Sequence, residues 1–175
     1  MALPLANRIT HKPVYVPSND DAWDHDRIER EKAQILEGEE SPWPELEDHP
    51  VVRYQGGVSR YDLATVQDYL DPSKSPLRFN LRRLNLNEWD ECQALAEGKS
   101  GGVVYASGPS RLYAIQKSLE SVEGLPEWQA HRKRKGWDVE DVEALRDILG
   151  EHEYIMLGFA AIAASRPLDP REKKL

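Results

Sequence analysis

The sequence predicts a mainly helical α+β protein, in which an extended acidic N-terminal arm precedes a small sheet or hairpin and about four helices. The chain has 175 residues, of which 39% are hydrophobic and 31% charged, as expected for one soluble domain. Residues 77–83 alternate apolar and polar side chains at the period of a strand. After residue 85, apolar side chains recur at helical spacing.

The negative charge is concentrated in one segment. The net charge is −8, and residues 20–48 contain twelve acidic residues against three basic ones. We expect residues 1–49 to form an acidic arm or linker with one short helix, and residues 50–175 to form a single domain. A solubilising tail is the alternative interpretation of the arm.

The first half of the chain offers short elements separated by prolines and glycines. Residues 14–16 are apolar and could add to a sheet edge. A helix within residues 20–37 could be capped by Asp24 or Asp26. The remaining elements expected here are a strand near 51–54 and a helix over 61–70.

The strand at 77–83 leads into a helix with a variant capping box. Asn85 can accept a hydrogen bond from the first turn, and Glu88 can reach back to the start of the helix. The apolar positions on one side of this helix are Trp89, Cys92, Leu95 and Ala96.

A second helix is expected between Pro109 and Gly124, with its apolar stripe at Leu112, Ile115, Leu119 and Val122. Residues 127–137 then form a polar connection. Asp138 begins a third helix, which ends at Gly150. The residues of this helix expected to face the core are Val142, Leu145, Ile148 and Leu149.

The last helix spans residues 151–165 and is apolar on every side from Ile155 to Ala164. Ten such residues are too few to cross a bilayer. The helix is therefore expected to be either the centre of the core or a subunit contact.

The residues most often used in catalysis occur here in settings that favour a structural role. Cys92 lies on an apolar helix face, where a small buried hydrophobe is expected. The histidines lack metal-ligand spacing, and Gly98-Lys99-Ser100 lacks the first glycine of a phosphate loop. Glu153 is the acid closest to an apolar setting. We expect no enzyme activity, and no catalytic, metal-binding or cofactor-binding residue.

Apolar side chains that could bind a partner occur in the arm and in the last helix. Trp23 and Trp43 lie in the charged arm, where each could anchor a partner or pack back on the body. The expected partner-binding residues are Tyr15, Trp23, Trp43, Ile155, Phe159 and Ile162.

One basic run, flanked by Trp128 and Trp137, consists of Arg132, Lys133, Arg134 and Lys135. It could be a solvated loop, a dock for the acidic arm, or a nucleic-acid patch acting with Arg78, Arg82 and Arg83. Nucleic acid is the least favoured of the three, because the chain as a whole is acidic.

Two stretches resemble small proteins of tailed bacteriophages and prophages. One is Ser75-Pro-Leu-Arg-Phe-Asn-Leu-Arg-Arg-Leu-Asn-Leu-Asn-Glu-Trp-Asp-Glu, similar to their "F-x-L-R-x-L" strand followed by a helix with an early glutamate. The other is the chain end from Ala163, with a short apolar helix, "S-x-P-L" and a charged tail. The opening Tyr15-Val-Pro-Ser, followed by acids, is similar too.

The resemblance implies a non-enzymatic role in tail morphogenesis, similar to that of tail-assembly chaperones. Its partners would be tape-measure, tail or connector subunits, or a second copy of the chain. A head–tail connector or minor structural component, and a small nucleic-acid-associated regulator, are the alternatives. Since Met1 to Ala6 does not resemble a signal peptide, we expect the host bacterial cytoplasm, or the virion, and no membrane.

Overall fold

The computed structural model describes residues 12–28, 30, 63–97, 108–125, 132–133 and 136–165. Its strands are β1 (Val14–Tyr15), β2 (Arg78–Leu81), β3 (Leu119–Glu123), β4 (Arg132–Lys133) and β5 (Gly136–Trp137). Its helices are α3 (Leu63–Asp68), α4 (Leu86–Glu97), α5 (Gly108–Ser118), α6 (Val139–Leu149) and α7 (Glu151–Ser165). A mainly helical α+β fold with a small antiparallel sheet is therefore confirmed.

Three strands form the main sheet in the order β1–β2–β3, with both pairs antiparallel. The alternation of apolar and polar side chains expected in β2 is confirmed over Arg78–Leu81. Phe79 and Leu81 are buried on one face, while Arg78 and Asn80 lie on the other. The strand expected near 51–54 lies outside the described residues. The 14–16 run does join a sheet edge, since Tyr15 pairs with Phe79.

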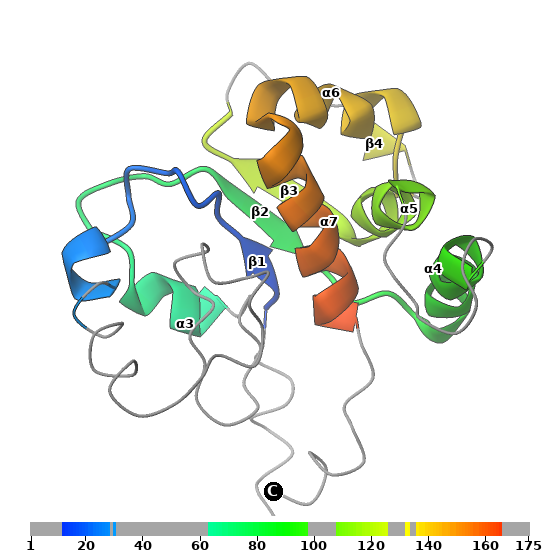
Figure 1. Ribbon diagram of the computed structural model, residues 1–175, viewed down its shortest axis with the longest axis horizontal. Coiled ribbons are helices and arrows are strands. Elements are labelled where there is room, and N and C mark those ends of the chain that lie inside the picture. Colours follow the sequence, from blue (N-terminus) through cyan, green and yellow to red (C-terminus); the bar gives the residue numbers. More distant parts are fainter. Residues whose placement is uncertain are drawn as a thin grey trace, which may run out of the picture.

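The helices α4, α5, α6 and α7 gather on the Phe79 face of the sheet. Figure 1 shows α7 crossing the sheet, with α5 and α6 beside it and α4 beyond α5. The capping box of α4 is confirmed: Asn85 N–H donates to Glu88 Oε2 at 2.9 Å, and Glu88 N–H donates to Asn85 Oδ1 at 2.9 Å. Gly158 lets α7 approach α5 closely, because a Cβ there would lie 2.7 Å from Arg111 Cβ.

A second, smaller apolar cluster lies on the opposite side of β1. Its buried members are Val14, Val16, Trp23, Ile28 and Val66. Because side chains alternate along a strand, Tyr15 points into the main core while its two neighbours point into the smaller cluster. The segments around Trp23 and Leu70 are also joined by a β-bridge, which ties residues 20–28 to the turn after α3.

The prediction of a helix between Pro109 and Gly124 was wrong in its last third. The helix α5 ends at Ser118, and Leu119–Glu123 forms β3. A β-bulge interrupts its pairing with β2, so that Leu81 faces Leu119 while Asn80 faces Ser121. The extra residue places Leu119 and Val122 on the same face of a strand, which gives the spacing of three that helices also show.

Two further expectations after β3 need correction. The polar connection at 127–137 contains a short hairpin of β4 and β5, and Trp137 is buried with its indole N–H on the carbonyl of Leu119 at 2.5 Å. Ile148 is 47% exposed instead of facing inward, because α6 turns Val142 and Leu145 to the core and leaves Ile148 at the margin.

Gly158→Ala tests the close approach of α5 and α7. The added methyl meets the Cβ of Arg111, which cannot move without its helix, so overpacking of about 1–3 kcal/mol should outweigh the ~1 kcal/mol gained in helix propensity. Denaturant unfolding should show a net loss of stability. Gly108→Ala is the control, since nothing lies within 4 Å of its added Cβ. Equal stabilities for the two variants would contradict the close approach.

Candidate functional site

One side of α7 presents apolar side chains that the rest of the described structure covers only in part. Ile155, Phe159 and Ile162 are each half-buried, and we call them the outer face of α7. At about 100° per residue, this face lies opposite Leu157 and Ala161, which are fully buried. Three of the residues that the sequence analysis expected to bind a partner therefore lie on one surface.

The outer face is flanked by α5 and backed by the main core. Phe159 and Ile162 rest against the core cluster, and the guanidinium carbon of Arg111 lies 5.7 Å from the Phe159 ring centroid. A cation over an aromatic face is attracted by the ring electrons. The arrangement offers an apolar contact with a basic group beside it.

The inner side of α7 carries one buried acid, Glu153. Its carboxylate accepts hydrogen bonds from the Tyr15 hydroxyl, the Ser18 hydroxyl and the Ser18 N–H, the last at 3.0 Å. Three donors satisfy a charge that would otherwise be costly to bury. The contact joins the strand β1 and the turn after it to the first turn of α7.

Two opposing effects set the pKa of Glu153. Burial by itself would raise the pKa of this carboxyl, but the hydrogen bonds from Ser18 and Tyr15 outweigh it and hold the pKa below its ordinary value of 4.5. A general acid at neutral pH needs a raised pKa. The geometry therefore assigns Glu153 an anchoring role.

The structure places the other expected partner-binding residues differently. Tyr15 is fully buried beneath α7, and Trp23 is buried in the smaller cluster with its indole N–H on the Pro17 carbonyl at 2.6 Å. Neither side chain offers surface to a partner in this conformation, so Trp23 follows the alternative of packing on the body. Trp43 lies outside the described residues.

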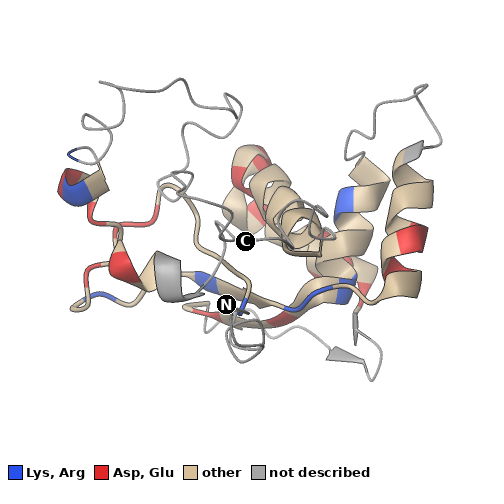
Figure 2. Ribbon diagram, turned by 90° about the horizontal axis from the view of Figure 1, so that it is seen from below, with Lys and Arg blue, Asp and Glu red and all other residues tan. Residues whose placement is uncertain are grey.

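Two of the three arginines expected to support a nucleic-acid patch, Arg78 and Arg82, are engaged by carboxylates, whereas Arg83 is exposed. Arg82 Nη1 and Nη2 donate to the two oxygens of Glu88 at 2.8 and 2.7 Å. Arg78 Nε donates to Glu123 at 3.0 Å. In Figure 2, basic and acidic segments lie side by side along the described sheet. Of the basic run, Arg132 and Lys133 form β4, whereas Arg134 and Lys135 lie outside the described residues.

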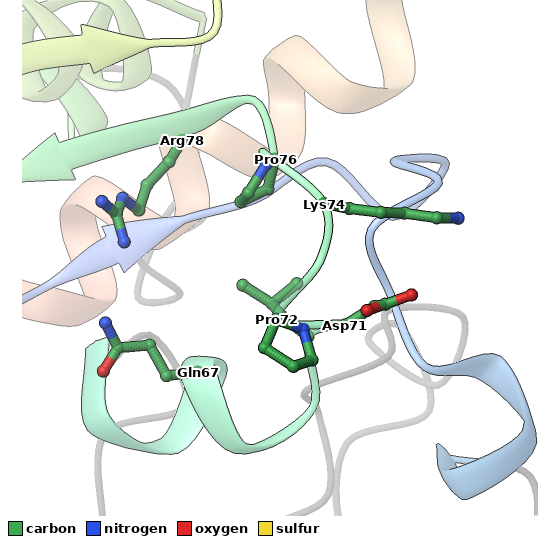
Figure 3. Close-up of a pocket in the computed structure, with 7 residues that line it drawn as sticks. Gln67, Asp71, Pro72, Lys74, Pro76 and Arg78 are labelled. Atoms are coloured by element: carbon green, nitrogen blue, oxygen red, sulfur yellow. The ribbon is translucent and has the colours of Figure 1, made fainter.

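A shallow groove of about 310 Å³ lies between α3 and the start of β2. Figure 3 shows Arg78 and Pro76 on one side of the groove and Gln67 and Pro72 on the other. Its charges are already partnered: Arg78 by Glu123, and Lys74 by the carbonyl of Asp21 at 2.6 Å. Asp71, the third, accepts from the Ser73 hydroxyl at 2.7 Å. Each charged side chain of the groove therefore already has a hydrogen-bond partner within the chain.

Other residues singled out by sequence have structural roles. Cys92 is buried between α4 and α5, and burial raises the pKa of its thiol. No three metal-ligating side chains converge within the described ranges. The part of the chain that the structure describes also contains no helix with the length and apolar character needed to cross a membrane.

Sequence reasoning missed Arg111 and Gly158 at the outer face. Their contact joins positions 47 residues apart on two helices, which no local pattern reveals. A glycine inside an apolar helix was the available signal, because such a residue often permits close packing.

Comparisons of the chain with family models, with curated proteins and with solved structures each find no match. The functional account therefore depends on the residues themselves.

Glu153→Gln tests the anchor between β1 and α7. A carboxyl whose pKa is lower in the folded than in the unfolded chain adds stability at neutral pH and loses it as the pH falls through the folded pKa. The free energy of unfolding of the variant should be about 2 kcal/mol below that of the wild type at pH 7. This difference between variant and wild type should shrink at pH 3. Chemical denaturation at both pH values measures it.

Glu151→Gln is the control for this experiment. Glu151 accepts hydrogen bonds from Arg146 at 2.5 and 2.6 Å, but the pair is exposed. Glu151→Gln should therefore lower the free energy of unfolding much less than Glu153→Gln does. A Glu153→Gln deficit that is the same at pH 3 as at pH 7 would contradict the ionised anchor.

Proposed function

We propose that the protein acts by binding other proteins, without catalysis, as an assembly factor of a tailed bacteriophage. Tail morphogenesis is the process favoured by the resemblance of residues 75–91 to phage proteins. The clients would be tape-measure, tail or connector subunits, as for a tail-assembly chaperone. It would act in the host cytoplasm before or during particle assembly.

The observation that carries the proposal is the outer face of α7. A helix that is apolar on all sides is normally covered on all sides. Here Ile155, Phe159 and Ile162 remain partly exposed. Burying them against a partner would remove apolar surface from water, which favours binding. Arg111 beside Phe159 adds charge to the contact, which favours a client with an acidic group near an apolar patch.

Ile155→Asp tests the face in a binding experiment. The full chain is co-expressed with the products of its neighbouring genes, and complexes are measured by size-exclusion chromatography and titration calorimetry. A charge at the centre of an apolar contact should weaken the complex by about tenfold or more. Ile148→Asp is the matched control, since Ile148 is an exposed isoleucine on α6.

Two outcomes would overturn the proposal. If none of the neighbouring gene products binds the chain, the assembly role fails. If a product binds but Ile155→Asp and Ile148→Asp weaken it equally, the outer face of α7 is not the contact.

A further inference from the structure

The strand β3 forms an edge of the main sheet. It pairs with β2 on one side, and no other described strand pairs with it. Edge strands carry backbone N–H and C=O groups that point away from the sheet and can accept another strand. Which groups point outward here follows from the register.

The register directs the backbone of Val122 outward. Leu81 N–H donates to the Pro13 carbonyl at 2.8 Å, so the backbone groups of Leu81 point toward β1. Those of Phe79, two residues earlier, point the same way. Val122 lies opposite Phe79 in the antiparallel β2–β3 pair, so the two form a pair without mutual hydrogen bonds. The N–H and C=O of Val122 therefore point away from β2.

These two groups have no hydrogen-bond partner among the described residues. The edge is bounded on both sides. At one end the Leu119 carbonyl is occupied by the Trp137 indole, and at the other Gly124, with φ of 89°, turns the chain away. The open part of the edge is short and centred on Val122.

The side chains around Val122 give this edge two different faces. On the inner face, half-buried Val122, Leu77 and Leu125 rest against the main core. On the outer face, Glu123 and Ser121 are exposed beside Arg78 and Asn80. An added strand would place an apolar residue opposite Val122 and polar residues on either side of it.

The charges of the edge select among possible strands. The acids Glu120 and Glu123 are exposed on β3, while the arginines that they attract, Arg82 and Arg78, lie one strand further in. A strand added beside β3 therefore meets the acidic row first. A second copy of β3, paired antiparallel about Val122, would set Glu123 opposite Ser121 and would bring no basic group to the acids.

We propose that the β3 edge binds an extended segment of a partner protein, in which basic residues flank an apolar one. The backbone of Val122 supplies two hydrogen bonds, and the apolar residue covers Val122 and Leu125. Lysine or arginine side chains lie beside Glu120 and Glu123. This surface is separate from the outer face of α7, so it extends the proposed function and does not depend on it.

Hydrogen exchange in the unmodified chain is the first test. The amide of Val122 should exchange rapidly in the free protein, whereas that of Phe79 in the central strand is protected. Adding the probe peptide acetyl-Thr-Lys-Val-Lys-Thr-amide should slow exchange at Val122 and leave Phe79 unchanged. A Val122 amide that is already protected without peptide, or unaffected by saturating peptide, would overturn the proposal.

Two variants of Val122 distinguish the contribution of its backbone N–H to peptide binding from that of its side chain. Val122→Pro and Val122→Ala both lose apolar contacts, but only the proline removes the N–H. Peptide binding, measured by chemical-shift titration, should be lost in Val122→Pro and kept in Val122→Ala; equal binding would contradict the edge. The counterpart peptide with glutamate for lysine should bind roughly two- to fivefold more weakly at low salt, and equal affinity would contradict the charge argument.

The two proposals can fail independently. Ile155→Asp should leave binding of the probe peptide unchanged, because the outer face of α7 takes no part in it. A loss of peptide binding in Ile155→Asp would contradict the assignment to β3.

Discussion

The need to cover α7 determines how the rest of the chain is arranged. Fifteen residues form this helix, and its middle is apolar on all sides. The sheet covers one side through Tyr15 and Phe79, and α5 covers another where Gly158 allows close contact with Arg111. The helix α6 covers a third. The outer face of α7 is what these elements leave, and the proposed function begins there.

The same constraint explains why the N-terminal segment belongs to the body. Tyr15 and Ser18 satisfy Glu153, the buried charge on the inner side of α7. Once β1 is held there, alternation along the strand turns Val14 and Val16 to the other side, where they seed the cluster around Trp23. A single buried carboxylate thus links both apolar clusters. The proposed boundary near residue 50 stays a prediction, because residues 31–62 lie outside the described part of the chain.

Local signals predicted much of the fold. The alternation at Phe79 and Leu81, the capping box of Asn85 and Glu88, and the helix stop at Gly150 were all visible because their causes lie within a few residues. The strand β3 was missed because its bulge imitates the spacing of a helix. The burial of Trp137 was missed because its partner, the Leu119 carbonyl, belongs to a distant element.

The candidate site was predictable in part for the same reason. Ile155, Phe159 and Ile162 share a face by helical periodicity alone, which is a local property of the sequence. The burial of Tyr15 and Trp23 depends on contacts with Glu153 and Val66, which lie far away in the chain. An aromatic residue in a charged, proline-rich segment therefore did not identify an exposed anchor.

The exposure of the outer face of α7 can be measured without knowing any partner. In the free chain with labelled isoleucine methyl groups, a soluble gadolinium chelate broadens each signal according to its access to solvent. Ile115 is fully buried and Ile148 is 47% exposed, so they provide internal references. The account predicts broadening of Ile155 and Ile162 between these two limits. Signals of both residues as protected as that of Ile115 would show that the face is closed and would contradict the account.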